Sequence, residues 1–306
     1  MPDSAVAWVF PGQGSQEVGM GKDICQAYPA ARELYDRADS ILARPLSRVC
    51  FEGPAEELSK TTNAQPALYV TSLACLAAAL AVAALEGEPA FVSGHSLGEY
   101  TALTAAGALA FEQGVRLVEE RGRLTQAAAD ATPGSMAAIL GLDEAAATAV
   151  CGDAGAELCN INSPGQLVIG GSKEAVARAC ALALERGARR AIPLDVGGAF
   201  HTSLMQPAVA GMTDAVAAAG IADAKIPMVA NNTAEPMTDA AAIEAELTYQ
   251  LTHPVRWVQC VEYMATHGVT TFVEIGPARV LTGLIKRIAP DAELRNISGV
   301  SSLGVK

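Results

Sequence analysis

The sequence predicts an α/β fold in which a large domain with a mostly parallel sheet is interrupted by a small ferredoxin-like subdomain. Over most of the 306 residues, short apolar runs alternate with helical stretches, which is typical of parallel strands joined by helices. Between about residues 130 and 200 the order becomes β-α-β-β-α-β, the ferredoxin-like arrangement. We therefore expect a discontinuous large domain over 1–130 and 200–306, and a small subdomain over 131–199.

The first part of the large domain begins with the apolar run "AVAWVF" at 5–10, which predicts a strand. A second strand is expected at "AFVSG", residues 90–94. The intervening and following text has helical composition and is rich in alanine, a strong helix former. Helices are expected over about 28–42, 64–85, 96–109 and 111–130.

The segment 67–85 is uncharged and long enough to span a bilayer. It is mostly alanine, contains Thr71, Ser72 and Cys75, and lacks a basic flank. These features favour a buried core helix over a membrane span. We expect no membrane partner.

The small subdomain has six predicted elements, and the turn residues 162–165 (Asn-Ser-Pro-Gly) separate its second and third strands. Strands are expected at 135–142, 157–162, 166–171 and 189–194, with helices at 143–150 and 173–187. The α/β pattern resumes after about residue 200. Further strands are expected at "PMVANN" (227–232) and "TTFVEIG" (270–276).

Composition excludes several classes of function. The net charge of −12 argues against a general nucleic-acid binder. The seven cysteines form no CxxC pair, so we expect reduced core thiols and neither a disulfide framework nor a zinc site. The first residues lack the basic region and long apolar run of a signal peptide. A cytoplasmic location is expected.

"GHSLGEY" at 94–100 contains G-x-S-x-G between a predicted strand and a predicted helix. This is the pattern of a nucleophile elbow, whose sharp turn needs small neighbours such as Gly94 and Gly98. Ser96 is therefore a candidate nucleophile, and the N–H of Leu97 a candidate oxyanion donor. An ordinary βα turn with Ser96 as a helix N-cap remains the alternative.

A serine nucleophile needs a base, and the chain has four histidines. His201 follows a glycine-containing loop where the two domains should meet, and is the candidate. His95 adjoins the serine on a tight turn that should direct its ring away. A plain position at a helix N-terminus is the alternative for His201.

Arg121 is the most informative charged residue. It shares one helix face with Leu117 and Leu124, and its neighbours at i±3 and i±4 include no carboxylate. A buried arginine needs a counter-charge from elsewhere. Either a long-range structural ion pair or the carboxylate of a ligand would supply it.

Six motifs occur in one order and together resemble the malonyl-CoA:acyl-carrier-protein transacylases of fatty-acid and polyketide synthesis. The resemblance covers about residues 5–290 and implies a hydrolase-like large domain with a ferredoxin-like insert. The motifs are "FPGQGSQ" (10–16), "GHSLGEY" (94–100), "RGR" (121–123), "NSPGQLVIGG" (162–171), "GAFH" (198–201) and "HPVRW" (253–257).

The resemblance implies a role for each matching residue. Ser96 matches the acylated nucleophile, His201 its base, and Arg121 the residue that pairs with the malonyl carboxylate. The backbone N–H groups of Gln13 and Leu97 match the oxyanion hole. Two further positions match less directly: Gln250, with Gln259 nearby, as the residue that orients the histidine, and Phe200, within "AFH", as a residue that favours malonyl over methylmalonyl or only packs.

The implied partners are a coenzyme A thioester and an acyl carrier protein that carries phosphopantetheine; no metal or cofactor is expected. Because carrier proteins of this kind are acidic, docking would need a local basic patch. A solvated face is the equally simple interpretation of the candidate residues, and we expect a monomer. The candidates are Arg186, Arg189, Arg190, Lys286 and Arg287.

Three alternative functions remain open at this point. A serine esterase or thioesterase of the α/β-hydrolase class should have an acidic triad member between nucleophile and histidine. A trans-acting polyketide acyltransferase with another extender unit would share all of the motifs. A degenerate, non-catalytic acyltransferase used for docking is the third.

Overall fold

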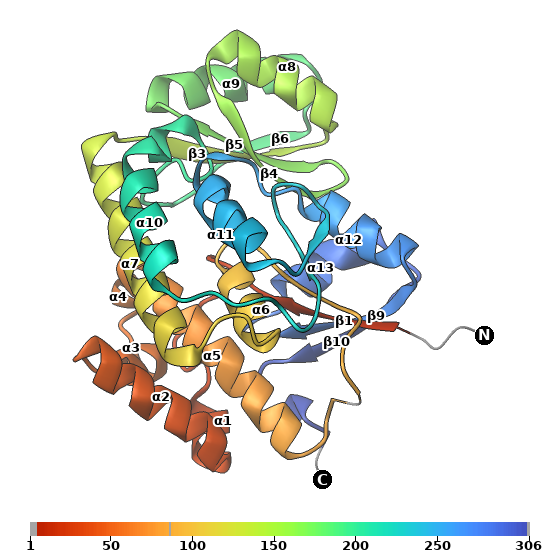
Figure 1. The fold of residues 1–306 in the computed structure, drawn as a ribbon. Coiled ribbons are helices and arrows are strands. Elements are labelled where there is room, and N and C mark those ends of the chain that lie inside the picture. Colours follow the sequence, from red (N-terminus) through yellow and green to blue (C-terminus); the bar gives the residue numbers. More distant parts are fainter. Residues whose placement is uncertain (1–4, 86, 305–306) are drawn as a thin grey trace.

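The computed structural model describes residues 5–85 and 87–304, which form two sheets with their helices (Figure 1). The six-stranded sheet has the order β10-β9-β1-β2-β7-β8, and its pairs are parallel except β7–β8. This arrangement confirms the predicted mostly parallel sheet. Its strands are β1 (Ala5–Phe10), β2 (Phe91–Gly94), β7 (Met228–Val229), β8 (Pro236–Met237), β9 (Val269–Ile275) and β10 (Glu293–Ile297).

Helices cover both faces of this sheet. On β1, Trp8 and Phe10 pack into one core cluster, while Ala7 and Val9 pack into another that includes residues of α12 and α13. A strand buried on both faces reads as a continuous apolar run, as "AVAWVF" does. The helices associated with the large sheet are α1 (Lys22–Ala27), α2 (Pro29–Leu42), α3 (Leu46–Glu52), α4 (Ala55–Ser59), α5 (Thr61–Ala81), α6 (Gly98–Ala105), α7 (Phe111–Ala131), α10 (Gln206–Ala218), α11 (Ala240–Tyr249), α12 (Trp257–Thr266) and α13 (Val280–Ile288).

Helix α5 contains most of the apolar segment 67–85, for which the sequence favours a buried core helix over a membrane span. Within 5–85 and 87–304 it is the one helix long and apolar enough to cross a membrane, and 83% of its apolar window is buried in the fold. It packs against α7 and α2. The predicted core helix is confirmed, although it begins three residues earlier than expected and ends at Ala81.

The four-stranded sheet has the order β4-β5-β3-β6, and every pair is antiparallel. With α8 and α9 on one face, it confirms the ferredoxin-like arrangement; Figure 1 shows these helices at the top of the molecule. The predicted domain boundaries at 130/131 and 199/200 stay a prediction. The elements are β3 (Ser135–Leu140), α8 (Glu144–Ala154), β4 (Glu157–Ser163), β5 (Gln166–Gly171), α9 (Lys173–Glu185) and β6 (Arg190–Pro193).

Strand β4 joins the small sheet to the large domain. Val255 of the "HPVRW" segment donates its N–H to the Cys159 carbonyl at 2.8 Å and accepts the Ile161 N–H at 2.9 Å. These main-chain hydrogen bonds fix the position of the small sheet above the carboxyl ends of the parallel strands. Ligands bind at that edge in open α/β sheets.

One predicted strand is much shorter than expected. The sequence predicted a strand over 227–232, but β7 ends at Val229. The next residue, Ala230, starts a turn in which its carbonyl accepts the Ala234 N–H at 2.9 Å. That turn releases Asn231 from the sheet and lets its side chain reach the functional site.

Candidate active site

Ser96 lies at a nucleophile elbow between β2 and α6. Its φ is +53°, in the left-handed region that is strained for a residue with a side chain. The turn is possible because both flanking residues are glycines. A side chain at Gly94 would place its Cβ 2.0 Å from the Gly98 carbonyl carbon, and one at Gly98 would place its Cβ 2.1 Å from the Phe10 carbonyl oxygen. The N-cap of α6 is Leu97, and Ser96 Oγ bonds His201 and Arg121 instead of the helix, so the N-cap alternative was wrong.

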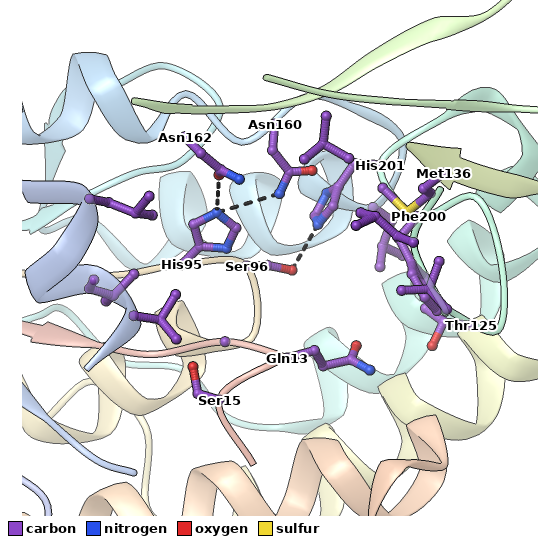
Figure 2. A pocket seen from close by; sticks show the side chains of 18 of the residues that line it. Gln13, Ser15, His95, Ser96, Thr125, Met136, Asn160, Asn162, Phe200 and His201 are labelled. Carbon is purple, nitrogen blue, oxygen red and sulfur yellow. Dashed lines mark hydrogen bonds between the residues drawn. The ribbon is translucent and has the colours of Figure 1, made fainter. Parts of the chain in front are cut away.

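His201 reaches the nucleophile from the loop before α10. Its Nε2 lies 2.8 Å from Ser96 Oγ, and its Nδ1 lies 2.9 Å from the Gln250 backbone carbonyl oxygen. Figure 2 shows Ser96 and His201 pointing toward each other. A carbonyl oxygen only accepts, so Nδ1 carries the proton and Nε2 is free to accept the serine proton.

Burial keeps this histidine neutral. Desolvation, followed by the charge of Arg121, lowers the pKa of His201 to about 3. Its side chain is therefore unprotonated, and able to act as a base, throughout the neutral pH range.

Arg121 lies beside the nucleophile on the buried face of α7 and is 3% exposed. Its Nη2 donates to Ser96 Oγ at 3.0 Å and to Gln250 Oε1 at 2.9 Å, and its Nη1 donates to Gln65 Oε1 at 2.9 Å. Its Nε is buried and has no hydrogen-bond partner in residues 5–85 and 87–304. Across the described chain, no carboxylate lies within 4.0 Å of it. The alternative of a direct structural ion pair is therefore wrong.

Gln250 contacts the site through both its backbone and its side chain. The backbone carbonyl accepts from His201, and the side-chain Nε2 donates to the Ser96 carbonyl at 3.1 Å. Gln259, the other glutamine in this region, bonds Glu144 on α8 instead. The loosely matched Gln250 is thus the glutamine that the fold brings to the histidine.

Gln13 and Leu97 flank the nucleophile from two segments. The loop after β1 packs closely on the elbow, since a Cβ at Gly12 would lie 2.3 Å from the His95 carbonyl oxygen. Within the part of the chain that the structure describes, the backbone N–H groups of Gln13 and Leu97 donate to no protein acceptor. Unused donors beside a nucleophile are the requirement for an oxyanion hole.

These groups open into one cavity of about 210 Å³ between the two sheets. Phe200 packs with Met136 and Val168 of the small sheet on one side of it. Figure 2 shows Phe200 and Met136 next to His201. Val280, Leu281 and Leu284 of α13 also line the cavity. The cavity is therefore apolar at its walls and polar at Ser96, His201 and Arg121, as small-molecule sites usually are.

Comparison with known proteins agrees with this geometry. Residues 7–302 match the family described as the acyl transferase domain. The chain belongs to this family. It is similar to the "Malonyl CoA-acyl carrier protein transacylase" of Bacillus subtilis, with 47% identity over 290 residues that cover 93% of this chain and 90% of that protein. The Escherichia coli K12 protein of the same name is 44% identical over 288 residues, 92% of each chain.

Solved structures of acyl transferases are similar over nearly the whole chain. An acyl carrier protein S-malonyltransferase from Vibrio cholerae has a TM-score of 0.94 and 41% identity, and covers 98% of this chain and 99% of its own. A malonyl-transacylase in complex with its type II PKS acyl-carrier protein has a TM-score of 0.92 and 40% identity over 98% of each chain.

Several residues of this acyl transferase site were not predicted from the sequence. The His95 ring turns toward the small sheet, where its Nε2 lies 2.9 Å from Asn162 Oδ1 and 3.4 Å from Asn160 Nδ2 (Figure 2). Asn231 Oδ1 accepts the Ser96 N–H at 2.6 Å. The available signal was positional: Asn160 and Asn162 alternate on one face of a strand, and Asn231 follows a strand at the sheet's carboxyl edge.

The lowered pKa of His201 predicts how reactivity at Ser96 depends on pH. The rate at which a fluorophosphonate probe modifies Ser96 should be flat from about pH 7.5 to about pH 5. If the base had the ordinary histidine pKa of about 6.5, the rate of modification would fall more than tenfold over that interval. The rate is measured by intact-mass spectrometry at a series of pH values.

Arg121→Ala is the matched variant for this pH profile, because it removes the second cause of the shift and should move the midpoint upward. A wild-type midpoint near pH 6.5 would contradict the account of a base held neutral by burial.

Proposed function

We propose that this chain transfers a malonyl group from malonyl-CoA to the phosphopantetheine thiol of an acyl carrier protein, through an ester on Ser96. The observation that carries the proposal is the buried guanidinium of Arg121, which lies 3.0 Å from the nucleophile and has no carboxylate partner among the residues that the structure describes. Arginine binds a carboxylate through two parallel hydrogen bonds. The names of the similar proteins support the same substrate and acceptor.

In the first half-reaction, His201 Nε2 removes the proton from Ser96 Oγ, which attacks the thioester carbonyl carbon. The resulting oxyanion accepts hydrogen bonds from the N–H groups of Gln13 and Leu97. Arg121 holds the distal carboxylate. The intermediate collapses with cleavage of the carbon–sulfur bond, and coenzyme A leaves as the thiol with the proton from His201.

In the second half-reaction, the phosphopantetheine thiol gives its proton to His201 and attacks the carbonyl carbon of malonyl-Ser96. The carbon–oxygen bond breaks and Ser96 Oγ recovers the proton. Both half-reactions use side chains and backbone donors only, so the proposed chemistry requires no metal or cofactor. We place this reaction in the cytoplasm, with a monomeric enzyme and without a nucleic-acid or membrane partner.

Phe200 contributes to acyl selectivity in this proposal. It is half-buried and packs on Met136 and Val168 directly before the base in the chain. An α-methyl branch on the acyl group would need space that the Phe200 ring takes up. This disfavours the alternative of a branched extender unit.

An esterase is the less well supported function. The histidine of an α/β-hydrolase triad is oriented by an acidic side chain. Here His201 Nδ1 bonds a backbone carbonyl, that of Gln250. The arginine beside the nucleophile would also have no role in hydrolysis of neutral esters.

The acidic carrier protein needs a basic docking surface, and the structure narrows the candidates. Arg189, Arg190 and Arg287 line one surface hollow with Gln166, which also lines the active-site cavity. Arg186 forms an ion pair with Asp153 at 2.5 Å, and we therefore no longer count it among the candidate docking residues. We propose that Arg189, Arg190 and Arg287, with Lys286 next to them on α13, form the docking patch for the carrier protein.

Arg121→Ala tests the carboxylate-binding role. The variant should lose about 100-fold in the rate of acylation by malonyl-CoA, because two charge-assisted hydrogen bonds to the acyl group are lost. Acylation by acetyl-CoA, which has no distal carboxylate, should change by less than about threefold. Both rates are measured by quenched intact-mass spectrometry, and Ser96→Ala is the control that must not be labelled. Unchanged malonyl selectivity in Arg121→Ala would refute the role.

Arg189→Glu combined with Arg190→Glu tests the docking patch. The KM for holo carrier protein should rise about tenfold, because a charge reversal repels an acidic partner. Arg186→Glu is the matched control: Arg186 does not line the hollow that contains Arg189, Arg190 and Arg287, so the effect of reversing its charge should stay within about twofold. An unchanged KM in the double variant would exclude this patch.

A further inference from the structure

Glu99 is a fully buried carboxyl of the "GHSLGEY" motif that the proposed reaction does not use. It lies three residues after the nucleophile on α6 and is 0% exposed. One oxygen, Oε1, accepts the Asn231 N–H at 2.5 Å. The other, Oε2, accepts from the side-chain Nε2 of Gln250. A buried acid hydrogen-bonded at both oxygens is held in one orientation.

Glu99 is linked to Arg121 through the side chain of Gln250. Gln250 Oε1 accepts from Arg121 Nη2 at 2.9 Å, while its Nε2 donates to Glu99 and to the Ser96 carbonyl. A guanidinium only donates hydrogen bonds. If the Gln250 amide were rotated by 180°, its NH₂ group would face the Arg121 guanidinium, which is also a donor, and its oxygen would face the Ser96 carbonyl, which is also an acceptor. The amide orientation is fixed, and Glu99 must accept.

A second link runs from Glu99 to the nucleophile elbow. Asn231, whose N–H bonds Glu99, accepts the Ser96 N–H at 2.6 Å and donates to the Gly94 carbonyl at 2.7 Å. One carboxylate thus contacts the groups that hold both Ser96 and Arg121. An ionised carboxylate can accept on both sides, whereas an amide in its place would present one donor to a donor.

The charges around the site explain why the link to Arg121 is indirect. A buried guanidinium with no counter-charge is strongly unfavourable. Glu99 is one amide away from Arg121, near enough to balance its charge without occupying the guanidinium. In the described chain, the Nε hydrogen of Arg121 and one hydrogen of its Nη1 have no protein acceptor, and they therefore stay available to an anionic ligand.

Other ionisable groups surround Glu99. Glu246 on α11 is 4% exposed and accepts the Asn232 N–H at 2.9 Å. Burial, followed by the charge of Glu246, raises the pKa of Glu99 well above its usual value, while Asn231, Gln250 and Arg121 oppose the increase. Burial also raises the pKa of Tyr100 to about 12 and that of Cys260 on α12, so both stay neutral.

We propose that Glu99 is a positioning residue for acyl-group selection: through Gln250 its carboxylate holds Arg121 next to Ser96 and balances its charge, leaving the guanidinium to a carboxylate-bearing acyl group. This inference rests on the proposed function, because it assumes that Arg121 receives the distal carboxylate of the acyl donor. It adds to the carboxylate of the acyl group a second carboxylate, that of Glu99, which fixes the position of the Arg121 guanidinium.

The test is the ratio of Ser96 acylation rates with malonyl-CoA and acetyl-CoA, measured by quenched intact-mass spectrometry. Glu99→Gln keeps the size of the side chain but removes the charge and one acceptor. The ratio should fall by about tenfold or more, because Arg121 loses its positioning. Glu246→Gln is the matched control. Glu246 contacts Gln250 only through its backbone carbonyl, which the substitution keeps, and its carboxylate accepts the Asn232 N–H, so the ratio should stay within about twofold of wild type.

The outcomes separate this inference from the proposed function. If the wild type itself shows no preference for malonyl, the proposed function fails. If the wild type prefers malonyl but both rates fall equally in Glu99→Gln, Glu99 is only structural and the inference is overturned. In an Arg121→Ala background, adding Glu99→Gln should change the ratio no further; an additive loss would also overturn it.

The pH dependence of the wild-type ratio tests the inference without any variant. Both acylations use the same base, so titration of His201 cancels in the ratio. Selectivity should be present at high pH, where Glu99 is ionised, and should decrease as the pH falls and Glu99 is protonated. Because the pKa of Glu99 is raised, this decrease should occur at a higher pH than for a glutamate with the ordinary pKa of about 4.3. A ratio that stays constant down to that ordinary value would contradict the role of Glu99.

Discussion

The buried positive charge of Arg121 is the constraint around which the site is organised. Its guanidinium is held by the oxygens of Gln65, Ser96 and Gln250, none of which carries a full charge in the resting enzyme. Such neutral acceptors offset only part of the desolvation of a cation. The carboxylate of Glu99, which reaches Arg121 through the Gln250 amide, offsets more of this desolvation cost. The part that is not offset favours binding of an anion in the cavity. Selectivity for a carboxylate and stability of the empty site are therefore linked.

Backbone geometry places the reacting atoms around this charge. Both Ser96 and His201 have φ in the left-handed region, at +53° and +61°. Residues with side chains are held there only when the surrounding structure determines the conformation. Here the close approach of Gly94, Gly98 and the β1 loop forces the first turn. Next to the second turn, the Ser203 N–H and hydroxyl donate to Glu157 of β4. The two residues that exchange the proton are thus among the six non-glycine residues of the described chain with a positive φ.

The sequence predicted both sheets, the elbow and the residues with distinctive chemistry, because apolar periodicity and G-x-S-x-G are local patterns. It predicted that Arg121 has no carboxylate partner on its own helix, because helix neighbours are also local, but it left open a partner from elsewhere in the chain. It did not predict Asn231 or the second role of Gln250, since each depends on where a turn directs a side chain across the fold. Glu99 belongs to the motif "GHSLGEY", but its burial and its hydrogen bonds depend on tertiary packing and could not be predicted from that motif. Likewise, the pairing of Arg186 with Asp153 joins residues 33 positions apart.

The central claim is that Arg121 receives the carboxylate of the acyl group carried by Ser96. The most direct measurement is a competition in which the enzyme is exposed briefly to equimolar malonyl-CoA and acetyl-CoA and the adduct on Ser96 is identified by peptide mass spectrometry. The account predicts that malonyl-Ser96 exceeds acetyl-Ser96 by about 100-fold, the ratio expected for two charge-assisted hydrogen bonds. Comparable amounts of the two adducts would contradict it.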